Sequence, residues 1–363
     1  MNRKPIILIM TSKDEVDDIS HKLANAIQII GTHNAVVMSD DKYGSATRRS
    51  ALDRLMDSGA EYQYILERKD RSAIKKNAVP RKFSKRVDRI KNMLKRFRPE
   101  YILCVTPYAH HCACEAKRKL RFNTQILYIV PTFTAPKRGL ADDVTNTYIV
   151  ENPDIKAELV RTGIRSKDIM TMGFPFEIYK KTEEEIAYDK QELGLPRAQT
   201  IFVHISNAQM LENVLELLID QGDLASIAVY CTNPKLIQKL GNLLIGYPEV
   251  TVLFVQASEK IDEYLSVCDL AITDYDTSII YKCFKLEIPS IIYTKDEHVL
   301  NDVNYLVNHG LCVRAKEDID VIELEYKLLQ TEYANEIGEN GAKWTEFNTL
   351  ENIANFLVSY IAV

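Results

Sequence analysis

The chain has 363 residues, of which 46% are hydrophobic and 27% are charged, and its formal net charge is −5. These values are typical of a globular protein with enough apolar residues for two cores. The sequence has no internal repeat of solenoid period and no low-complexity segment. No apolar run reaches the roughly 18 residues that span a bilayer. The apolar run 6–10 leads directly into polar residues, so it predicts a buried first strand and not a signal peptide.

The cysteines indicate a reducing compartment. Their number, seven, is odd, no CxxC pair occurs, and most lie in apolar segments. We therefore expect buried free thiols in a cytoplasmic protein. Cys112 and Cys114 stand beside His110 and His111, but ligands so close together on one predicted helix do not easily surround a tetrahedral ion. The sequence predicts no metal site.

In chain order, the first half alternates short apolar runs with amphipathic stretches. The runs are continuous, which predicts strands buried on both faces, in a parallel sheet covered by helices. The predicted strands are 6–10, 35–38, 62–66, 101–105 and 126–130, and the predicted helices are 14–30, 47–58, 81–97 and 109–120.

The same pattern starts again near residue 200, which predicts a second doubly wound α/β domain. Its predicted strands are 201–205, 227–231, 250–255, 270–273 and 288–293, and its predicted helices are 208–221, 233–246, 259–267, 278–286 and 299–308. Two final helices are expected over 320–335 and 341–360. The last one carries Trp344 and is apolar enough to pack against the first domain. The predicted domains are 1–172 with 345–363, and 173–344.

One segment is strongly basic. Between Arg68 and Arg98 there are fourteen Lys and Arg and two Asp, a local charge of +12 that leaves −17 for the rest of the chain. Apolar residues at spacings of three and four predict a helix that packs by one face. Its basic positions form either a solvated surface or a face that docks on an anionic membrane. They include Lys82, Lys85, Arg86 and Arg89. Nucleic acid is not expected as a partner, because no helix-turn-helix or aromatic stacking pattern accompanies the charge.

Four stretches of the sequence together resemble one family. They are Arg98–Pro107, Tyr148–Pro175, Val252–Thr273 and Tyr305–Val313. In register over most of residues 98–315, they resemble the motifs of the monogalactosyldiacylglycerol synthase-like glycosyltransferases. The resemblance implies a GT-B architecture, in which two facing Rossmann-like domains border an interdomain cleft. It also implies a nucleotide-diphosphate sugar, UDP-linked, as co-substrate, with no further cofactor.

A second resemblance overlaps the third stretch. Asp269–Ser278, followed by Pro289–Tyr293, is similar to a segment of the CDP-glycerol glycerophosphotransferases, which also have the GT-B fold. The histidines of that family's signature do not appear in this sequence.

The first resemblance implies a donor site on the second domain. A nucleotide diphosphate needs backbone N–H groups and helix N-termini directed at it. The implied residues are Ser206, Asn207, Ala208, Gln209, Asp276, Thr277 and Ser278 for the phosphates, Val255 and Gln256 for the base, Lys282 at the ribose, and Asn301 and Asp302 for the sugar. The phosphate segments also fit ordinary helix caps, and His204, inside a predicted strand, also fits a core histidine, so both interpretations stay open.

The sequence departs from the family pattern where chemistry is expected. Ser206-Asn207-Ala208 replaces a glycine-rich loop that lets the backbone approach a phosphate. Asp276 and Thr277 replace a glycine-containing turn. Residues 131–136 lack the Asp and His that the family uses for the acceptor hydroxyl. The candidates for the missing base are His110, His111 and Asp142.

These features together predict a glycosyltransferase. It would move a sugar from a UDP-linked donor to a lipid or polysaccharide acceptor of the cell envelope, in the cytoplasm or at the inner face of the membrane. Two alternatives stay open, a CDP-glycerol-type glycerophosphotransferase and a non-catalytic GT-B protein that binds a partner. The oligomeric state does not follow from the sequence.

Overall fold

The computed structural model describes residues 4–11, 17–39, 81–120, 123–134, 142–195, 199–221, 226–257, 260–345 and 349–361. The chain divides into two compact units. The first unit comprises Met1–Phe176 and Phe347–Val363, and the second comprises Glu177–Glu346. The predicted helix 47–58 and strand 62–66 lie outside the described residues.

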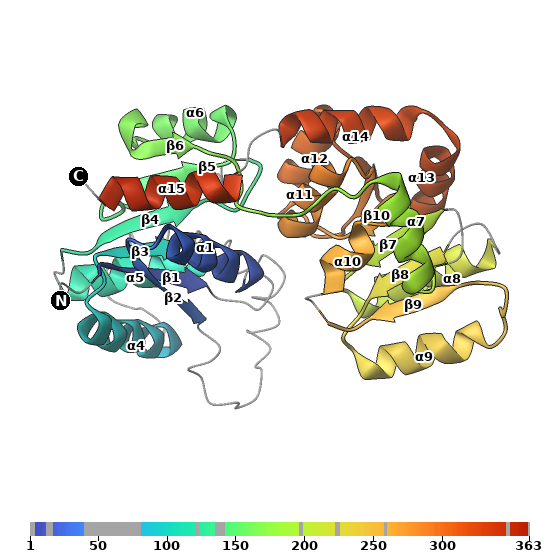
Figure 1. Ribbon diagram of the computed structural model, residues 1–363, viewed down its shortest axis with the longest axis horizontal. Helices are drawn as coiled ribbons and strands as arrows, with labels where there is room; N and C mark the ends of the chain where they lie inside the picture. The colour runs from blue at the N-terminus through green and yellow to red at the C-terminus, as the bar shows by residue number, and fades with distance from the viewer. Residues whose placement is uncertain are drawn as a thin grey trace. The chain divides into compact units, whose positions relative to one another are not determined.

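The first unit is built on a parallel sheet with six described strands in the order β2-β1-β3-β4-β5-β6 (Figure 1). Its strands are β1 (Ile6–Thr11), β2 (Asn34–Ser39), β3 (Tyr101–Cys104), β4 (Gln125–Ile129), β5 (Thr147–Val150) and β6 (Ile169–Thr171). The side chains of β1, β3 and β5 are buried along their whole length. This burial on both faces explains why the strands appear in the sequence as continuous apolar runs.

Helices cover both faces of the first sheet. One face packs against α4 (Arg81–Phe97), α5 (Pro107–Leu120) and α6 (Pro153–Arg161). The other face carries α1 (Asp17–Ile30), beside which lies α15 (Thr349–Ile361), the last helix of the chain (Figure 1).

The basic helix α4 packs as its pattern predicts. Val87, Ile90 and Leu94 are buried in the core, while Lys95 and Arg96 are exposed. Among the described residues, no helix combines the length and the apolar character that crossing a membrane requires.

The second unit repeats the design with a parallel sheet in the order β12-β11-β10-β7-β8-β9. Its strands are β7 (Thr200–His204), β8 (Ser226–Tyr230), β9 (Val252–Val255), β10 (Leu270–Thr273), β11 (Ser290–Tyr293) and β12 (Val313–Ala315). Its helices are α7 (Glu183–Glu192), α8 (Ala208–Asp220), α9 (Pro234–Leu244), α10 (Ile261–Leu265), α11 (Thr277–Leu286), α12 (Leu300–Asn308), α13 (Asp318–Gln330) and α14 (Tyr333–Trp344). The predicted α/β class with two Rossmann-like sheets is confirmed.

Two apolar layers enclose the second sheet. One layer joins alternate strand residues to α8, α9 and α13. The other joins the remaining strand residues to α7, α10 and α11. Against the outside of α11 packs α14, which approaches closely because it carries glycines: a Cβ at Gly341 would lie 2.9 Å from the Cα of Phe284.

The end of the chain differs from the prediction. Three helices (α13, α14 and α15) stand where two were expected. The first break falls at Thr331 and Glu332, without the Gly or Pro that marks such a break in a sequence. Trp344 ends α14 in the second unit and stacks edge-on with Tyr305 and His309, so the prediction that it belongs to the last helix was wrong.

Candidate functional site

The order of strands in the second sheet identifies where a ligand is expected. The chain begins this sheet at β7, continues outward to β8 and β9, and then returns to β10 on the other side of β7. The connections that follow β7 and β10 therefore leave toward opposite faces. In open α/β sheets, ligands bind outside the carboxyl ends of the strands at such a switch point. Ser206–Gln209 and Asp274–Ser278 follow these two strands, and we call them together the switch-point edge.

The connection after β7 forms a capped helix start. Asn207 is the N-cap of α8, and its side chain accepts hydrogen bonds from the backbone N–H groups of Gln209 and Met210. Ser206, Asn207, Ala208 and Gln209 are all exposed. Asn207 therefore satisfies two of the first amides of α8.

The connection after β10 is built in the same way. Asp276 is the N-cap of α11 and accepts a hydrogen bond from the backbone N–H of Ile279 at 3.1 Å. Thr277 and Ser278 are the first two residues of α11, and the N–H groups of such residues have no acceptor inside their helix. The positive end of the α11 dipole lies at the same place.

Asp274 joins the two connections. One of its carboxylate oxygens accepts a hydrogen bond from the backbone N–H of Ser206 at 2.8 Å. The other lies 3.8 Å from Nδ1 of His204, the last residue of β7. The structure thus brings the two predicted phosphate segments together, and it does so through a carboxylate that the sequence did not single out for this role.

The predicted sugar residues lie at the start of α12. Asp302 is buried, and its carboxylate accepts a hydrogen bond from the hydroxyl of Tyr275 at the switch-point edge. Asn301 is exposed. The contact between Tyr275 and Asp302 brings the beginning of α12 next to the turn between β10 and α11.

The remaining predicted nucleotide contacts lie outside the two segments of the switch-point edge. They are Lys282, Val255 and Gln256. The ammonium group of Lys282 is buried on α11 and forms an ion pair with Asp262 of α10. Val255 is buried at the end of the edge strand β9, and Gln256 follows it, exposed. Two strands therefore separate the predicted base contacts from β10.

The electrostatics of the switch-point edge explain the unusual sequence. Asp274, Asp276 and Asp302 place three carboxylates at or beside this edge, and carboxylates near a diphosphate are repulsive. Each of the three accepts a hydrogen bond within the protein. These hydrogen bonds disperse part of their charge and leave the amides of Ala208, Thr277 and Ser278 for an anion.

In the first unit, His110 occupies a packed position. It is 5% exposed, its ring stacks on Tyr128 with centroids 4.1 Å apart, and Nε2 lies 2.7 Å from the hydroxyl oxygen of Thr145. Such a ring is held by core contacts. His111, its neighbour on the first turns of α5, is partly exposed and keeps more access to a bound molecule.

Asp142 lies at the amino edge of the first sheet, whereas His110 and His111 follow β3 at its carboxyl edge. Its carboxylate forms an ion pair with Arg118 at 2.6 Å and accepts a hydrogen bond from the backbone N–H of Val144. Arg118 belongs to the last turn of α5, which returns to the amino ends of the strands. The carboxylates raise the pKa of Arg118 against the opposing effect of burial, the largest single influence. This arrangement is that of a structural ion pair.

Glu151 is a carboxylate that the sequence analysis missed. It follows β5 directly at the carboxyl edge of the first sheet and is 8% exposed. The Asn152 side-chain amide donates hydrogen bonds to Glu151 and to the carbonyl of Phe133, while Asn152 caps α6. The available signal was its position, since an acidic residue directly after a buried strand stands at the edge where ligands bind.

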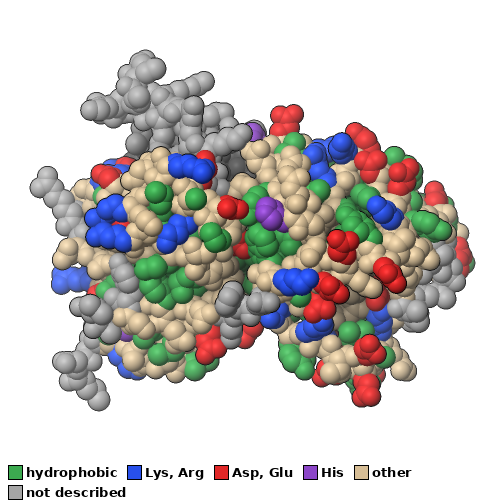
Figure 2. Space-filling view, turned by 90° about the horizontal axis from the view of Figure 1, so that it is seen from above, with side chains coloured by type: hydrophobic (Ala, Val, Ile, Leu, Met, Phe, Trp, Pro, Cys, Tyr) green, Lys and Arg blue, Asp and Glu red, His purple; other side chains and the backbone are tan. Residues whose placement is uncertain are grey.

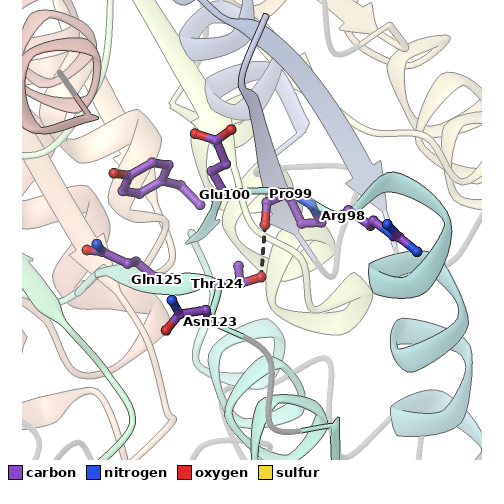
Figure 3. A pocket seen from close by; sticks show the side chains of 7 residues that line it. Arg98, Pro99, Glu100, Asn123, Thr124 and Gln125 are labelled. Carbon is purple, nitrogen blue, oxygen red and sulfur yellow. Dashed lines mark hydrogen bonds between the residues drawn. The ribbon is translucent and has the colours of Figure 1, made fainter. Parts of the chain in front are cut away.

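A depression of about 520 Å³ lies at the other end of the first sheet. Figure 3 shows that it is lined by the residues just before β3 and β4, where the hydroxyl of Thr124 donates to the carbonyl of Pro99 at 2.8 Å. This is the amino edge of the sheet, so the depression does not coincide with the switch-point edge or with any predicted site residue.

All seven cysteines are buried thiols outside disulfide bonds. Burial raises the pKa of the Cys104 thiol well above its ordinary value, and neighbouring Cys114 and Cys112 add to that shift. Within the described ranges, no group of three His, Cys, Asp or Glu side chains is arranged to hold a metal ion.

Residues 23–176 match the model of the monogalactosyldiacylglycerol (MGDG) synthase family. No curated protein sequence matches the chain. Among solved structures, MnaA from S. aureus with UDP has a TM-score of 0.70 and 11% identity, and the alignment covers 99% of this chain and 97% of that one.

Two further solved structures are similar over their whole length. UDP-GlcNAc 2-epimerase from Neisseria meningitidis, bound to UDP-GlcNAc, has a TM-score of 0.67 and 13% identity, with 99% of this chain and 100% of that one covered. MurG from Acinetobacter baumannii has a TM-score of 0.61 and 12% identity, with 98% and 99% covered. At these identities the likeness shows the fold. The chain is a GT-B-fold protein that is similar to the monogalactosyldiacylglycerol synthase family over residues 23–176.

Proposed function

We propose that this protein is a glycosyltransferase that binds a UDP-linked sugar at the switch-point edge of its second unit. The observation that carries the proposal is the meeting of two helix N-termini, those of α8 and α11, at the switch point of the second sheet. Such an arrangement suits a diphosphate, because amides and helix dipoles offset its charge. The match of residues 23–176 to a glycosyltransferase family supports transfer as the reaction.

Each residue of the proposed site has its own role in donor binding or catalysis. The amides of Ala208, Thr277 and Ser278 receive the diphosphate, and Asn301 contacts the sugar. Stabilising the leaving diphosphate by amides and dipoles needs no metal ion. Of the predicted bases, His111 has the exposure that proton transfer from an acceptor hydroxyl requires.

The acceptor belongs to the same proposal. Helix α4 carries eight basic residues, and Lys95 and Arg96 stand exposed beside its buried apolar face. On the face shown in Figure 2, basic and acidic side chains of the described residues are interspersed. An amphipathic basic helix suits an anionic membrane. We therefore propose a lipid or glycan acceptor of the cell envelope, met at the inner membrane face.

A substitution that removes one amide tests the donor site. Proline is well tolerated at the first position of a helix, and Asp276 already has the extended backbone, with φ of −113° and ψ of 108°, that the residue before a proline needs. Thr277→Pro should therefore fold normally and lose one N–H donor. We expect the Kd for UDP, measured by calorimetry, to rise by roughly 10- to 100-fold, as for loss of a hydrogen bond to a charged group.

The matched control is Glu183→Pro, at the first position of α7 after the extended N-cap Thr182. It should leave the Kd for UDP unchanged. If the wild-type chain shows no thermal stabilisation by UDP at millimolar concentration, the donor proposal is wrong. Stabilisation by CDP and not by UDP would instead favour a glycerophosphotransferase, and stabilisation by neither a non-catalytic partner protein.

A nucleotide-sugar epimerase is a second candidate. It is favoured by one observation, the higher TM-score of the Neisseria meningitidis 2-epimerase than of MurG. Proton NMR of UDP-GlcNAc incubated with the protein and no acceptor separates the two activities. An epimerase converts the sugar nucleotide into an isomer, whereas a transferase leaves it intact until an acceptor is added.

A further inference from the structure

Three polar side chains and Ile292 form one register row over four strands at the carboxyl edge of the second sheet. His204 of β7 is the register partner of Thr273 of β10, which pairs with Ile292 of β11, which pairs with Arg314 of β12. Register partners in a parallel sheet point to the same face. The neighbouring strand residues Val203, Ile272 and Ile291 belong to the layer under α8, α9 and α13, so the row lies on the face that α11 covers.

Three atoms of this row lack partners. Nδ1 of His204, the hydroxyl of Thr273 and Nε of Arg314 are buried and make no hydrogen bond. His204 is 6% exposed and Thr273 is fully buried. Leaving such polar atoms unsatisfied is unfavourable, and in proteins they usually have a partner or a functional reason. Two of them, Nδ1 of His204 and the hydroxyl of Thr273, lie on neighbouring strands directly before the switch-point edge, where a polar ligand can approach.

His204 has the geometry to contact that ligand. Its Nδ1 faces a carboxylate oxygen of Asp274 at 3.8 Å, and its ring lies 5.2 Å from that of Tyr230. The remaining nitrogen, Nε2, has no hydrogen bond within the described residues and is not among the buried atoms without a partner, so it reaches the surface of the edge. The carboxylate beside Nδ1 favours the ring orientation in which Nε2 is directed away from Asp274.

We propose that His204 binds the terminal phosphate of the nucleoside diphosphate through Nε2, with Asp274 positioning its ring. This inference rests on the proposed function, since it assumes a diphosphate at the switch-point edge. It explains how the chain can bind a diphosphate without the glycine-rich loop of the related family. A side-chain N–H donor at Nε2 supplies the hydrogen bond that close backbone approach supplies elsewhere. His204 is then specific for the terminal phosphate, and the amide donors serve both phosphates.

Variants of the full chain test the contact through the number of phosphates on the ligand. Asparagine can replace Nδ1 of histidine but has no atom at the place of Nε2. His204→Asn should therefore raise the Kd for UDP by roughly 10- to 100-fold and leave the Kd for UMP and uridine nearly unchanged. His204→Gln, whose amide can reach the place of Nε2, should recover part of the affinity for UDP. His309→Asn, at an exposed histidine beyond α12, is the control and should bind UDP as the wild type does.

The outcomes separate this inference from the function on which it rests. A wild-type chain that binds no nucleoside diphosphate overturns both. A wild-type chain that binds UDP, together with a His204→Asn variant of equal affinity, overturns the role of His204 alone. Equal weakening of UDP and uridine also overturns it, because it would indicate a structural effect. Should the variant fail to fold, histidine-labelled wild-type protein decides the question by NMR, since the Nε2 resonance of His204 must shift with UDP and stay unchanged with uridine.

Discussion

Glu325 shows what burial does to a single carboxyl group in this fold. It lies on α13 with 3% of its surface exposed, and Oε2 has no hydrogen-bond partner. Burial raises the pKa of Glu325 to about 7 from 4.5, and the Gln221 side chain opposes this shift only in part. The folded protein therefore binds this proton more tightly than the unfolded chain does. The stability that it contributes is complete below the unfolded pKa and is lost as pH rises through about 7.

Substituting this residue should remove that pH dependence. Between pH 5 and pH 8, the wild type should lose about 2–3 kcal/mol more stability than Glu325→Gln, because the variant has no proton to release. Urea unfolding at both pH values measures the difference. Equal losses in the two proteins would mean that Glu325 ionises freely in the folded state. Glu323→Gln, at an exposed glutamate two residues away on the same helix, is the control and should lose as much stability as the wild type does.

At the switch-point edge, residue-level predictions succeeded where local chemistry decides them. Asn207 lies in a segment that also fitted an ordinary helix cap, and it is the N-cap of α8, because an Asn side chain can accept hydrogen bonds from the first amides of a helix. The partnership of Asp274 with Ser206 was not predictable, since 68 residues separate them and only the pairing of β7 with β10 brings them together.

At the scale of elements, two glycines inside helices have opposite surroundings. On α14, a Cβ at Gly338 would collide with the carbonyl oxygen of Glu287, which ends α11. On α9, a Cβ at Gly241 would meet no atom within 4 Å. The first glycine is therefore required by the close packing of α14 on α11, and the second is not required by packing.

The same substitution should change stability in opposite directions at these two positions. Gly241→Ala should stabilise the protein by up to about 1 kcal/mol, because alanine has the higher helix propensity. Gly338→Ala gains the same propensity but forces the two helices apart, and overpacking of this kind costs about 1–3 kcal/mol. Chemical denaturation of both variants measures the changes. A Gly338→Ala variant as stable as Gly241→Ala would show that α14 is free to shift on α11.

At the scale of the whole molecule, the uneven charge of the chain makes membrane binding testable. Reversing three residues of α4, Lys85, Arg86 and Arg89, to Glu should weaken co-sedimentation with anionic vesicles by at least about 100-fold, since each basic residue near the surface contributes about 1 kcal/mol. Neutral vesicles should bind neither protein.

The control for this experiment changes the net charge equally on another part of the first unit. Arg161, Arg165 and Lys167 are exposed at and after the end of α6. Reversing them should leave vesicle binding almost intact if α4 is the docking face. Equal losses in the two triple variants would attribute binding to overall charge and would refute a docking role for α4.

The sequence predicted the architecture better than its details. Continuous apolar runs identified most strands, for example β7, predicted over 201–205 and found at Thr200–His204, because burial on both faces is visible in composition. The inner strand β5 was not predicted, although it is buried along its whole length. The edge strands β6 and β12 were missed because three residues are too few to show a pattern. At the site, the packed position of His110 was not predictable. Its neighbours Tyr128 and Thr145 come from separate segments, which only the completed sheet brings together.

The return of α15 to the first unit has a consequence for how the chain acquires its structure. The hydroxyl of Thr349 donates to the carbonyl of Phe174 at 2.6 Å, and Ile353 and Leu357 are fully buried. During synthesis, the α1 face of the first unit therefore stays uncovered until the entire second unit has left the ribosome. The second unit is one uninterrupted segment and can complete its own core first. The second unit is therefore synthesised later than most of the first unit but can finish folding before it.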